Sequence, residues 1–152
     1  MVELRRATAF DADAVVRVYL RSRHHAVPHI PPLSGPDDSV REWLAGVVVN
    51  GGEVWVAETG DGVVVAMMLL EGEWIEQLYV DPSLTGQGIG TQLLEHAKRE
   101  KPGGLQLWTF QSNVRAHRFY ERHGFTAVEQ TDGSGNQEHA PDVRYVWAAR
   151  LA

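Results

Sequence analysis

The N-terminal third of the chain changes from a strand pattern to a helical one. Apolar and charged residues alternate from Val2 to Arg6, which predicts a strand. Thr8 and Asp11 then have the spacing of a capping box, and the apolar residues that follow recur at helical intervals. Beyond a proline-rich loop at residues 28–32, a second amphipathic helix is expected from Asp37 onward. The pattern therefore predicts one strand followed by two helices.

Three strand patterns follow, separated by short glycine turns. They cover Val54–Glu58, Val63–Leu70 and Trp74–Val80. The turns between them are typical of hairpins, so the three strands should form a meander. A glycine-rich loop and a helix that ends at Pro102 come next. The last expected elements are a strand at Leu105–Phe110, a helix at Asn113–His123, and strands at Phe125–Glu129 and Asp142–Ala149.

Elements in this order predict a mixed sheet with helices on its faces, which is an α/β (α+β) fold. We expect about seven strands and about four helices. The 152 residues fit a single domain over residues 1–152, because two domains would each lack a sizeable core. Hydrophobic residues make up 43% and charged residues 22%, a composition that is globular rather than disordered.

Charge and cysteine content narrow the chemistry. The net charge of −6 argues against binding a nucleic-acid backbone, which requires a basic surface. The chain has no cysteine, which excludes disulfides, a thiolate nucleophile and a cysteine metal site. Its apolar runs are too short to span a membrane, and no apolar segment follows the N-terminal charges as in a signal peptide. We therefore expect a cytoplasmic protein with no membrane or nucleic-acid partner.

Three glycines, Gly86, Gly88 and Gly90, lie between a predicted strand and a predicted helix. Glycines let a ligand approach the backbone closely, and the free N–H groups of the first helical turn attract a phosphate or pyrophosphate. The loop has no lysine or arginine, so backbone amides would bind such a group. Its spacing fits neither a Walker A loop nor a dinucleotide fingerprint. By itself, the loop is equally consistent with tight packing of a strand against a helix.

Two longer segments place this loop in a wider context. Residues 78–82 read LYVDP and precede GQGIG at 86–90, while residues 113–125 read NVRAHRFYERHGF. At this separation they resemble motifs A and B of the GNAT superfamily of N-acetyltransferases, and residues 4–8 are similar to the family's N-terminal segment. The resemblance covers essentially the whole chain. It implies the acyl-CoA N-acyltransferase fold, with a mostly antiparallel sheet, and transfer of an acetyl group from acetyl-CoA to an amine without a metal.

The resemblance also implies the cofactor contacts. The strand edge at Leu78, Tyr79 and Val80 would pair with the pantetheine arm, where the next strand diverges. A backbone N–H of Val80 or Tyr79 would donate to the thioester oxygen as that oxygen gains charge. Asn113 matches a family residue that hydrogen-bonds the arm. Thr85 stands where the family often has Gln or Arg, a departure that bears on affinity and not on the cofactor's identity. The pyrophosphate would bind the N–H groups of Gln87, Gly88, Ile89, Gly90 and Thr91.

Proton transfer has two candidate residues. Tyr120 matches the family's general acid, which donates to the coenzyme A sulfur, whereas a tyrosine on an apolar helix face is otherwise a core residue. Glu76, on the strand that leads into the loop, is the candidate base for the amine, with Glu73 as the alternative. Either carboxylate would otherwise face solvent. The absence of cysteine excludes an acetyl-cysteine intermediate and so favours direct transfer.

The sequence does not determine the identity of the acceptor. We expect the primary amine of a small molecule, with a protein N-terminus or lysine as the alternative within the same class. A non-catalytic acyl-CoA-binding module is the alternative from another class. Trp74 and Tyr79 either line the acceptor pocket or belong to the core. Dimers are common in the family, so a homodimer is left open.

Further polar side chains each have two interpretations. Glu138 or Asp142 attracts a cationic amine or belongs to a solvated loop. Arg118, on the motif B helix, approaches a cofactor phosphate or is an exposed charge. The histidines of the first helix and its loop lack carboxylates at metal-ligand spacing, which favours a surface or acceptor-lining role. These histidines are His24, His25 and His29.

Overall fold

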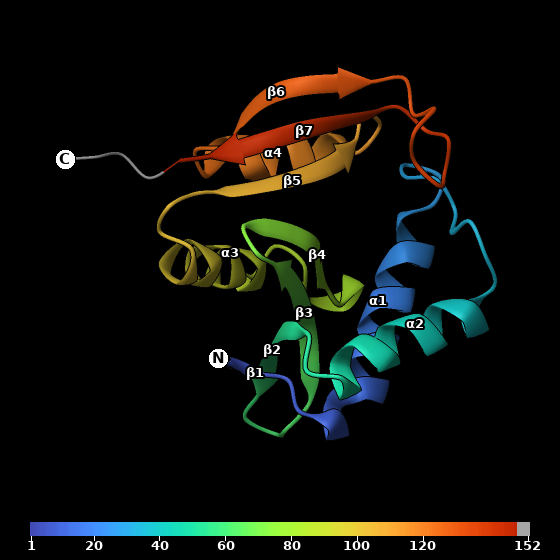
Figure 1. The fold of residues 1–152 in the computed structure, drawn as a ribbon. Helices are drawn as coiled ribbons and strands as arrows, with labels where there is room; N and C mark the ends of the chain where they lie inside the picture. The colour runs from blue at the N-terminus through green and yellow to red at the C-terminus, as the bar shows by residue number, and fades with distance from the viewer. Residues whose placement is uncertain (149–152) are drawn as a thin grey trace.

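The computed structural model describes residues 1–148, in which seven strands form one sheet (Figure 1). The strands are β1 (Val2–Arg6), β2 (Glu53–Thr59), β3 (Val64–Glu71), β4 (Trp74–Val80), β5 (Leu105–Phe110), β6 (Thr126–Thr131) and β7 (Asp142–Trp147). The helices are α1 (Ala12–Ala26), α2 (Asp37–Val49), α3 (Ile89–Glu100) and α4 (Val114–Arg122), with short 3₁₀ turns η1 (Ala9–Asp11) and η2 (Pro82–Leu84). All the expected elements are present; Ala149, the expected end of the last strand, lies outside the described residues.

The strand order is β1-β2-β3-β4-β5-β7-β6. Neighbouring strands run antiparallel except β4 and β5, which are parallel. The chain passes from β4 to β5 through α3, because parallel neighbours require a crossover connection. The mixed, mostly antiparallel sheet is thereby confirmed.

Helices cover both faces of the sheet (Figure 1). On one face α1 and α2 bury Val15 and Leu44 completely, and on the other α3 buries Leu93. Each of these helices buries the apolar stripe that its period predicts. Trp43 is an exception: it lies on the predicted stripe of α2 but remains 45% exposed, with its ring edge against Tyr19.

The central strand β3 is enclosed on both sides. Seven of its eight residues are buried. Met67 packs among residues of the α1 and α2 side, whereas Met68 packs with those of the α3 side. The sequence of β3 is therefore a continuous apolar run. A strand with one solvent-exposed face would instead alternate apolar and polar residues.

Candidate active site

A cleft of about 720 Å³ lies where β4 and β5 separate. The two strands pair at Trp74 and Gln106, next to a 2.9 Å hydrogen bond from the Gln106 N–H to the Glu73 carbonyl. Within the described residues, no other residue pair joins these strands. The rest of the β4 edge has no neighbouring strand, which leaves its backbone donors and acceptors available to an extended ligand.

Five residues expected at the site line this cleft. They are Glu76, Leu78, Tyr79, Asn113 and Tyr120. The other expected contacts, residues 80 and 87–91, are not in its lining and lie at the end of β4 and the start of α3. The remaining walls come from α1, β5 and the segment from β6 to β7.

The backbone of β4 alternates between its two sides. The Asp81 N–H donates to the Val65 carbonyl at 2.8 Å, which sets the ladder to β3. An antiparallel ladder uses every second residue, so the Tyr79 N–H is directed toward β3 and that of Val80 away from it. Ser22 agrees with this direction, since its hydroxyl donates from α1 to the Val80 carbonyl at 3.1 Å. Of the two N–H groups considered for the thioester oxygen, the geometry therefore favours Val80.

A β-bulge gives Glu76 its position. The pairing of β3 with β4 passes from Leu69 and Gln77 to Leu70 and Ile75, which leaves Glu76 without a partner. A bulge redirects the side chain of its extra residue, and here that side chain lines the cleft.

The two candidate bases differ in their surroundings. Partial burial, reinforced by the charge of Glu71, raises the pKa of Glu76. Glu76 has no ion pair within residues 1–148, so a cationic group entering the cleft would be its partner. Glu73 lies outside the cleft lining and accepts a 2.6 Å hydrogen bond from the Gln106 side chain. Its carboxylate therefore joins the turn before β4 to β5, and Glu76 is the better placed of the two candidates.

Tyr120 lies on the cleft side of α4 and is 7% exposed. Its ring packs edge-on against Phe119 and Phe125, with centroids 5.1 and 5.4 Å apart. Burial raises the pKa of its hydroxyl, and the nearby Tyr79 adds to this. Across residues 1–148 no hydrogen bond to this hydroxyl is formed. A phenol held protonated beside a cleft, without a protein acceptor, is suited to donate a proton to a ligand.

Three buried side-chain atoms in the described part of the chain lack a hydrogen-bond partner: Arg23 Nε, His96 Nε2 and Thr109 Oγ1. Arg23 and Thr109 belong to residues that line the cleft. Buried polar groups are nearly always satisfied in folded proteins, so orphans concentrated at one site point to a ligand. The cleft therefore contains buried polar atoms that have no hydrogen-bond partner in the described residues and are available to a ligand.

The glycine loop is built to present backbone amides. Gly86 and Gly88 have φ of +81° and +82°, and Gly88 is the N-cap of α3. A Cβ at either position would meet nothing within 4 Å, so these glycines are required by backbone conformation and not by crowding. The N–H groups of the first turn, at Ile89, Gly90 and Thr91, have no intrahelical acceptor. They lie where the motif places a pyrophosphate.

Asn113 has a structural role besides the expected one. Its side-chain oxygen accepts a 3.2 Å hydrogen bond from the Ala116 N–H and so caps α4. The cap directs its amide group into the cleft lining. One residue thus begins the helix that carries Tyr120 and leaves NH₂ donors for a ligand.

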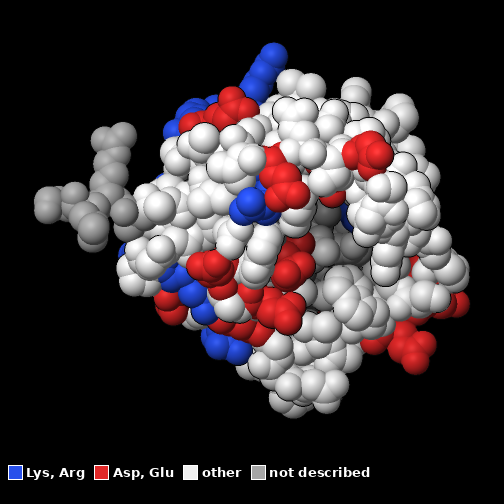
Figure 2. All heavy atoms as spheres, turned by 45° about the horizontal axis from the view of Figure 1, so that its top comes forward, with Lys and Arg blue, Asp and Glu red and all other residues white. Residues whose placement is uncertain are grey.

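Acidic side chains gather around a hollow on this face of the molecule (Figure 2). Glu129, Glu138 and Asp142 line the cleft together with Glu76. Glu129 is paired with Arg144 at 2.9 Å, and Asp142 accepts a hydrogen bond from Thr131. The side chain of Glu138 is 17% exposed and lies 3.9 Å from Arg23. Glu138 and Asp142 therefore belong to the cleft wall and not to a solvated loop.

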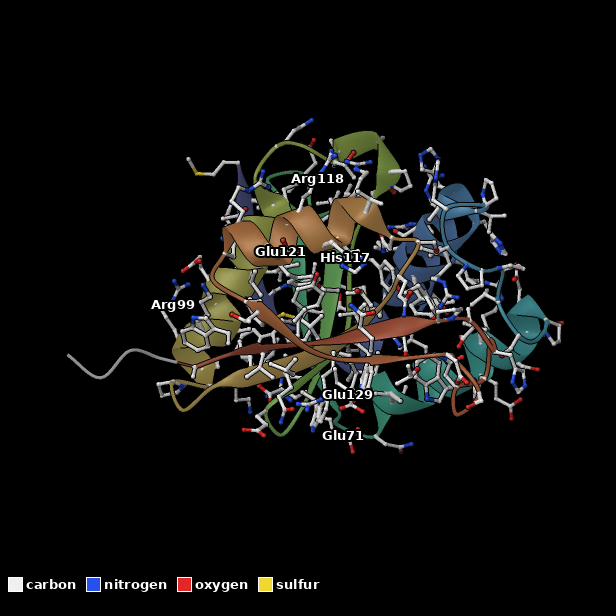
Figure 3. All side chains as sticks on the ribbon, turned by 90° about the horizontal axis from the view of Figure 1, so that it is seen from above. Glu71, Arg99, His117, Arg118, Glu121 and Glu129 are labelled. Atoms are coloured by element: carbon white, nitrogen blue, oxygen red, sulfur yellow. The ribbon has the colours of Figure 1, made fainter. Side chains whose placement is uncertain are left out.

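Other sequence candidates lie apart from the cleft. His24 is paired with Asp37 at 2.9 Å, and neither His25 nor His29 lines the cleft. Trp74 does not line the cleft. Its role is structural, because it forms the residue pair that joins β4 to β5. Figure 3 shows Arg118 on α4 on the side of the glycine loop, opposite Glu71 and Glu129.

Arg23 is a residue of the cleft that was not among the candidates predicted from the sequence. It is four residues after Tyr19 on α1, on the helix face that packs against the sheet, and it is 5% exposed. The sequence could have identified Arg23 as a candidate, because it places a cation at a core-facing helix position. Arg is almost never fully buried unless it is paired.

The chain matches the family model of the acetyltransferase (GNAT) domain over residues 50–127. It is 30% identical to the peptidyl-lysine N-acetyltransferase YjaB of Salmonella typhimurium over 132 residues, covering 87% of this chain and 88% of that protein. It is 28% identical to an aminoalkylphosphonate N-acetyltransferase of the same organism, over 81% of this chain and 84% of that one. The solution structure of Escherichia coli YjaB superposes with a TM-score of 0.77 at 22% identity, over 99% of each chain.

The chain belongs to the GNAT family, and it is an acetyl-CoA-dependent N-acetyltransferase. Its seven-stranded sheet with four helices is the fold of that family. In residues 1–148 no group of three or more His, Asp or Glu side chains is placed to hold a metal ion. Among the same residues, none of the helices combines the length and apolar character needed to cross a membrane.

Proposed function

We propose that this enzyme transfers the acetyl group directly to the primary amine of a small molecule in the cleft between β4 and β5. The observation that carries the proposal is that Glu76 and Tyr120 line one cleft beside the free edge of β4. A base for the amine and an acid for the leaving sulfur are the two proton-transfer groups that this reaction needs.

The residues present fit coenzyme A. Leu78, Tyr79 and Val80 provide a strand edge for the pantetheine arm, and Asn113 provides an amide. The pyrophosphate would accept hydrogen bonds from the N–H groups of Gln87, Gly88, Ile89, Gly90 and Thr91. The unsatisfied hydroxyl of Thr109 adds a buried donor in the same cleft.

Acetyl-CoA supplies the reactive thioester, and the chain's own groups manage protons and charge. Glu76 accepts a proton from the acceptor ammonium, which frees the nitrogen lone pair, and its raised pKa suits it to a base near neutral pH. The Val80 N–H would donate to the acetyl oxygen. As the carbon–nitrogen bond forms and the carbon–sulfur bond breaks, the Tyr120 hydroxyl would give its proton to the sulfur, and the second proton lost by the nitrogen would restore that hydroxyl.

Coenzyme A release tests this proposal directly. A thiol reagent reports the product without background, because the chain contains no cysteine. We expect acetyl-CoA to raise the melting temperature and small primary amines to release coenzyme A at higher kcat/KM than lysine-containing peptides. Stabilisation by acetyl-CoA without turnover of any amine would overturn the enzymatic role in favour of a binding module.

Acetylation of protein lysine is the second candidate, and the relative named as a peptidyl-lysine N-acetyltransferase favours it. A lysine in a peptide needs a groove that admits main chain on both sides. In this protein Arg23 of α1 and Glu138 of the β6–β7 loop approach to 3.9 Å and bound the cleft there. Because this contact closes the cleft on that side, it favours a small-molecule acceptor over a lysine within a peptide.

A further inference from the structure

Arg23 is a cation in the wall of the cleft. Its side chain is 5% exposed, and it comes from the face of α1 that packs on the sheet. Its guanidinium lies 5.9 Å from the ring centre of Tyr19 and 6.0 Å from that of Phe110. Phe110 is itself part of the cleft lining, so the charge lies between two aromatic rings at the edge of the site.

The protein satisfies this charge incompletely. Arg23 donates to the Tyr19 hydroxyl at 3.2 Å and to the Pro31 carbonyl at 3.4 Å. The nearest carboxylate oxygen, on Glu138, is 3.9 Å away, which is beyond hydrogen-bond distance. The Nε atom is buried and has no partner among the described residues. A buried guanidinium with five donors ordinarily has a closely paired anion, and here that place is only partly filled.

Arg23 lies on the reaction side of the cleft. Burial raises the pKa of Tyr79 to about 12, and the charge of Arg23 opposes that rise. Tyr79 in turn adds to the raised pKa of Tyr120. Arg23, Tyr79 and Tyr120 all line the cleft, so the unsatisfied cation and the candidate acid belong to the same site.

We propose that Arg23 binds the carboxylate of the acceptor, so that the acceptors of this enzyme are amino acids or amino-acid-like amines. The inference rests on the proposed function and names its substrate class. A carboxylate matches the planar fork of a guanidinium and would satisfy Nε together with a neighbouring N–H. Glu76 then faces the ammonium group, and the two ends of the substrate meet opposite charges.

Glu138 has a defined part in this arrangement. It is the carboxylate next to Arg23 when no acceptor is bound, and its 3.9 Å contact is loose enough for a substrate carboxylate to replace it. Removal of its charge therefore strengthens acceptor binding, whereas removal of Arg23 weakens it. A purely structural Arg23–Glu138 pair would respond in the same direction to both changes.

Matched acceptors test the proposal. The probes are ω-amino acids of increasing chain length, from glycine to 6-aminohexanoate, and the carboxamide of each. At the best length we expect the acid to exceed its amide about tenfold or more in kcat/KM, the scale of a good charge-assisted pair. In Arg23→Gln the KM of the acid should rise by about that factor while the amide is unaffected, and Arg23→Lys should be intermediate.

Two further variants separate the role of Arg23 from general charge effects. Glu138→Gln should lower the KM of the acid. Arg41→Gln, which removes an exposed arginine of α2, should leave the preference unchanged. Equal use of acid and amide by the wild-type enzyme, or a parallel loss of both acceptors in Arg23→Gln, would overturn the inference while leaving N-acetyltransfer intact.

Binding gives a readout that does not depend on turnover. The Arg23 Nε–H resonance, assigned by its loss in Arg23→Lys, should shift on titration of the wild-type protein with butyrate and not with butyramide. An unmoved resonance contradicts the inference even if Arg23→Gln fails to fold. If the resonance shifts but no amine releases coenzyme A, the carboxylate site stands and the proposed acetyl transfer fails.

Discussion

Trp74 and Gln106 form the residue pair that joins β4 to β5, and the cleft opens from that point. Beside it, the Gln106 N–H bonds the Glu73 carbonyl, and the Gln106 side chain bonds the Glu73 carboxylate at 2.6 Å. Parallel strands of similar length would ordinarily pair further. Separation after one pair leaves the β4 edge free, so this contact marks the closed end of the candidate site.

Tyr120→Phe should lower kcat about 10²- to 10³-fold, as expected for the loss of a general acid, with little change in the melting temperature. The hydroxyl bonds no group in the described chain, while the ring contacts with Phe119 and Phe125 are kept. Steady-state kinetics and thermal unfolding of the same preparation check both halves. Unchanged kcat would remove Tyr120 from the mechanism.

Tyr145→Phe is the matched control. Tyr145 is 1% exposed, and its hydroxyl donates to Glu121 at 2.7 Å and also contacts His117. Loss of these bonds leaves partners unsatisfied at a cost of about 1–3 kcal/mol of unfolding free energy. This variant should therefore melt earlier and retain kcat, the reverse of Tyr120→Phe.

Glu76→Gln should reduce kcat/KM about 10²-fold and remove the acid limb of the pH–rate profile. Protonation of Glu76 ends its role as a base, so wild-type activity falls as the pH drops through its raised pKa. Glu71→Gln should move that limb to lower pH, since the charge of Glu71 helps to raise the pKa of Glu76. Glu73→Gln should not move it, and equal shifts in both variants would argue against Glu76.

The pH dependence of the free energy of unfolding gives a second, independent test of the raised pKa of Glu76. Its pKa is raised on folding, so the folded protein binds the proton more tightly and loses stability as the pH rises from the ordinary glutamate value through the raised one. Glu76→Gln should therefore increase the free energy of unfolding at neutral pH, with the difference vanishing below pH 4. Urea unfolding across this range is the measurement; a destabilised variant at pH 7 contradicts the expectation.

Gly88→Ala should raise the KM for acetyl-CoA about fivefold or more, because about 1 kcal/mol of strain at a φ of +82° disturbs the amides of the loop. Gly51→Ala is the control, with a φ of +83°, open space around its Cβ and a position after α2. Both variants should lose similar stability, and only the first should lose affinity for the cofactor. Isothermal titration with coenzyme A distinguishes them.

Asp11→Asn tests the ion pair between Arg5 of β1 and the turn η1 that precedes α1. The hydrogen bonds from Arg5 hold the pKa of Asp11 at about 2, and Asp11 is 8% exposed. A lowered pKa stabilises the fold above the ordinary aspartate value, and this stability disappears as the pH falls toward 2. The variant should lose about 1–2 kcal/mol at pH 7, with the gap closing in acid. Asp13→Asn, at an exposed position in the first turn of α1, should cost less.

Several elements were predictable because their causes are local. Alternation predicted β1, the turn signals beside them predicted β4 and β5, and the limits of all three agree with the structure. A period of 3.6 placed the buried stripe of α3. The glycines of the loop were informative because a left-handed φ almost demands glycine. The resemblance to the family supplied Tyr120 as a candidate, and the position of Glu76 on the strand before the loop made it the candidate base; both line the cleft.

What depends on distant parts of the chain was not predictable. The bulge that positions Glu76 is a mismatch between β3 and β4, and the choice of Val80 over Tyr79 follows from their register. Arg23 and Glu138 are far apart in sequence, and only folding brings a buried cation of α1 against a carboxylate of the β6–β7 loop. The sequence by itself determined the elements, the family and the cofactor loop, since these depend on short-range patterns. The tertiary structure decided which charges share the cleft and which remain unsatisfied, because burial and pairing belong to the packed whole.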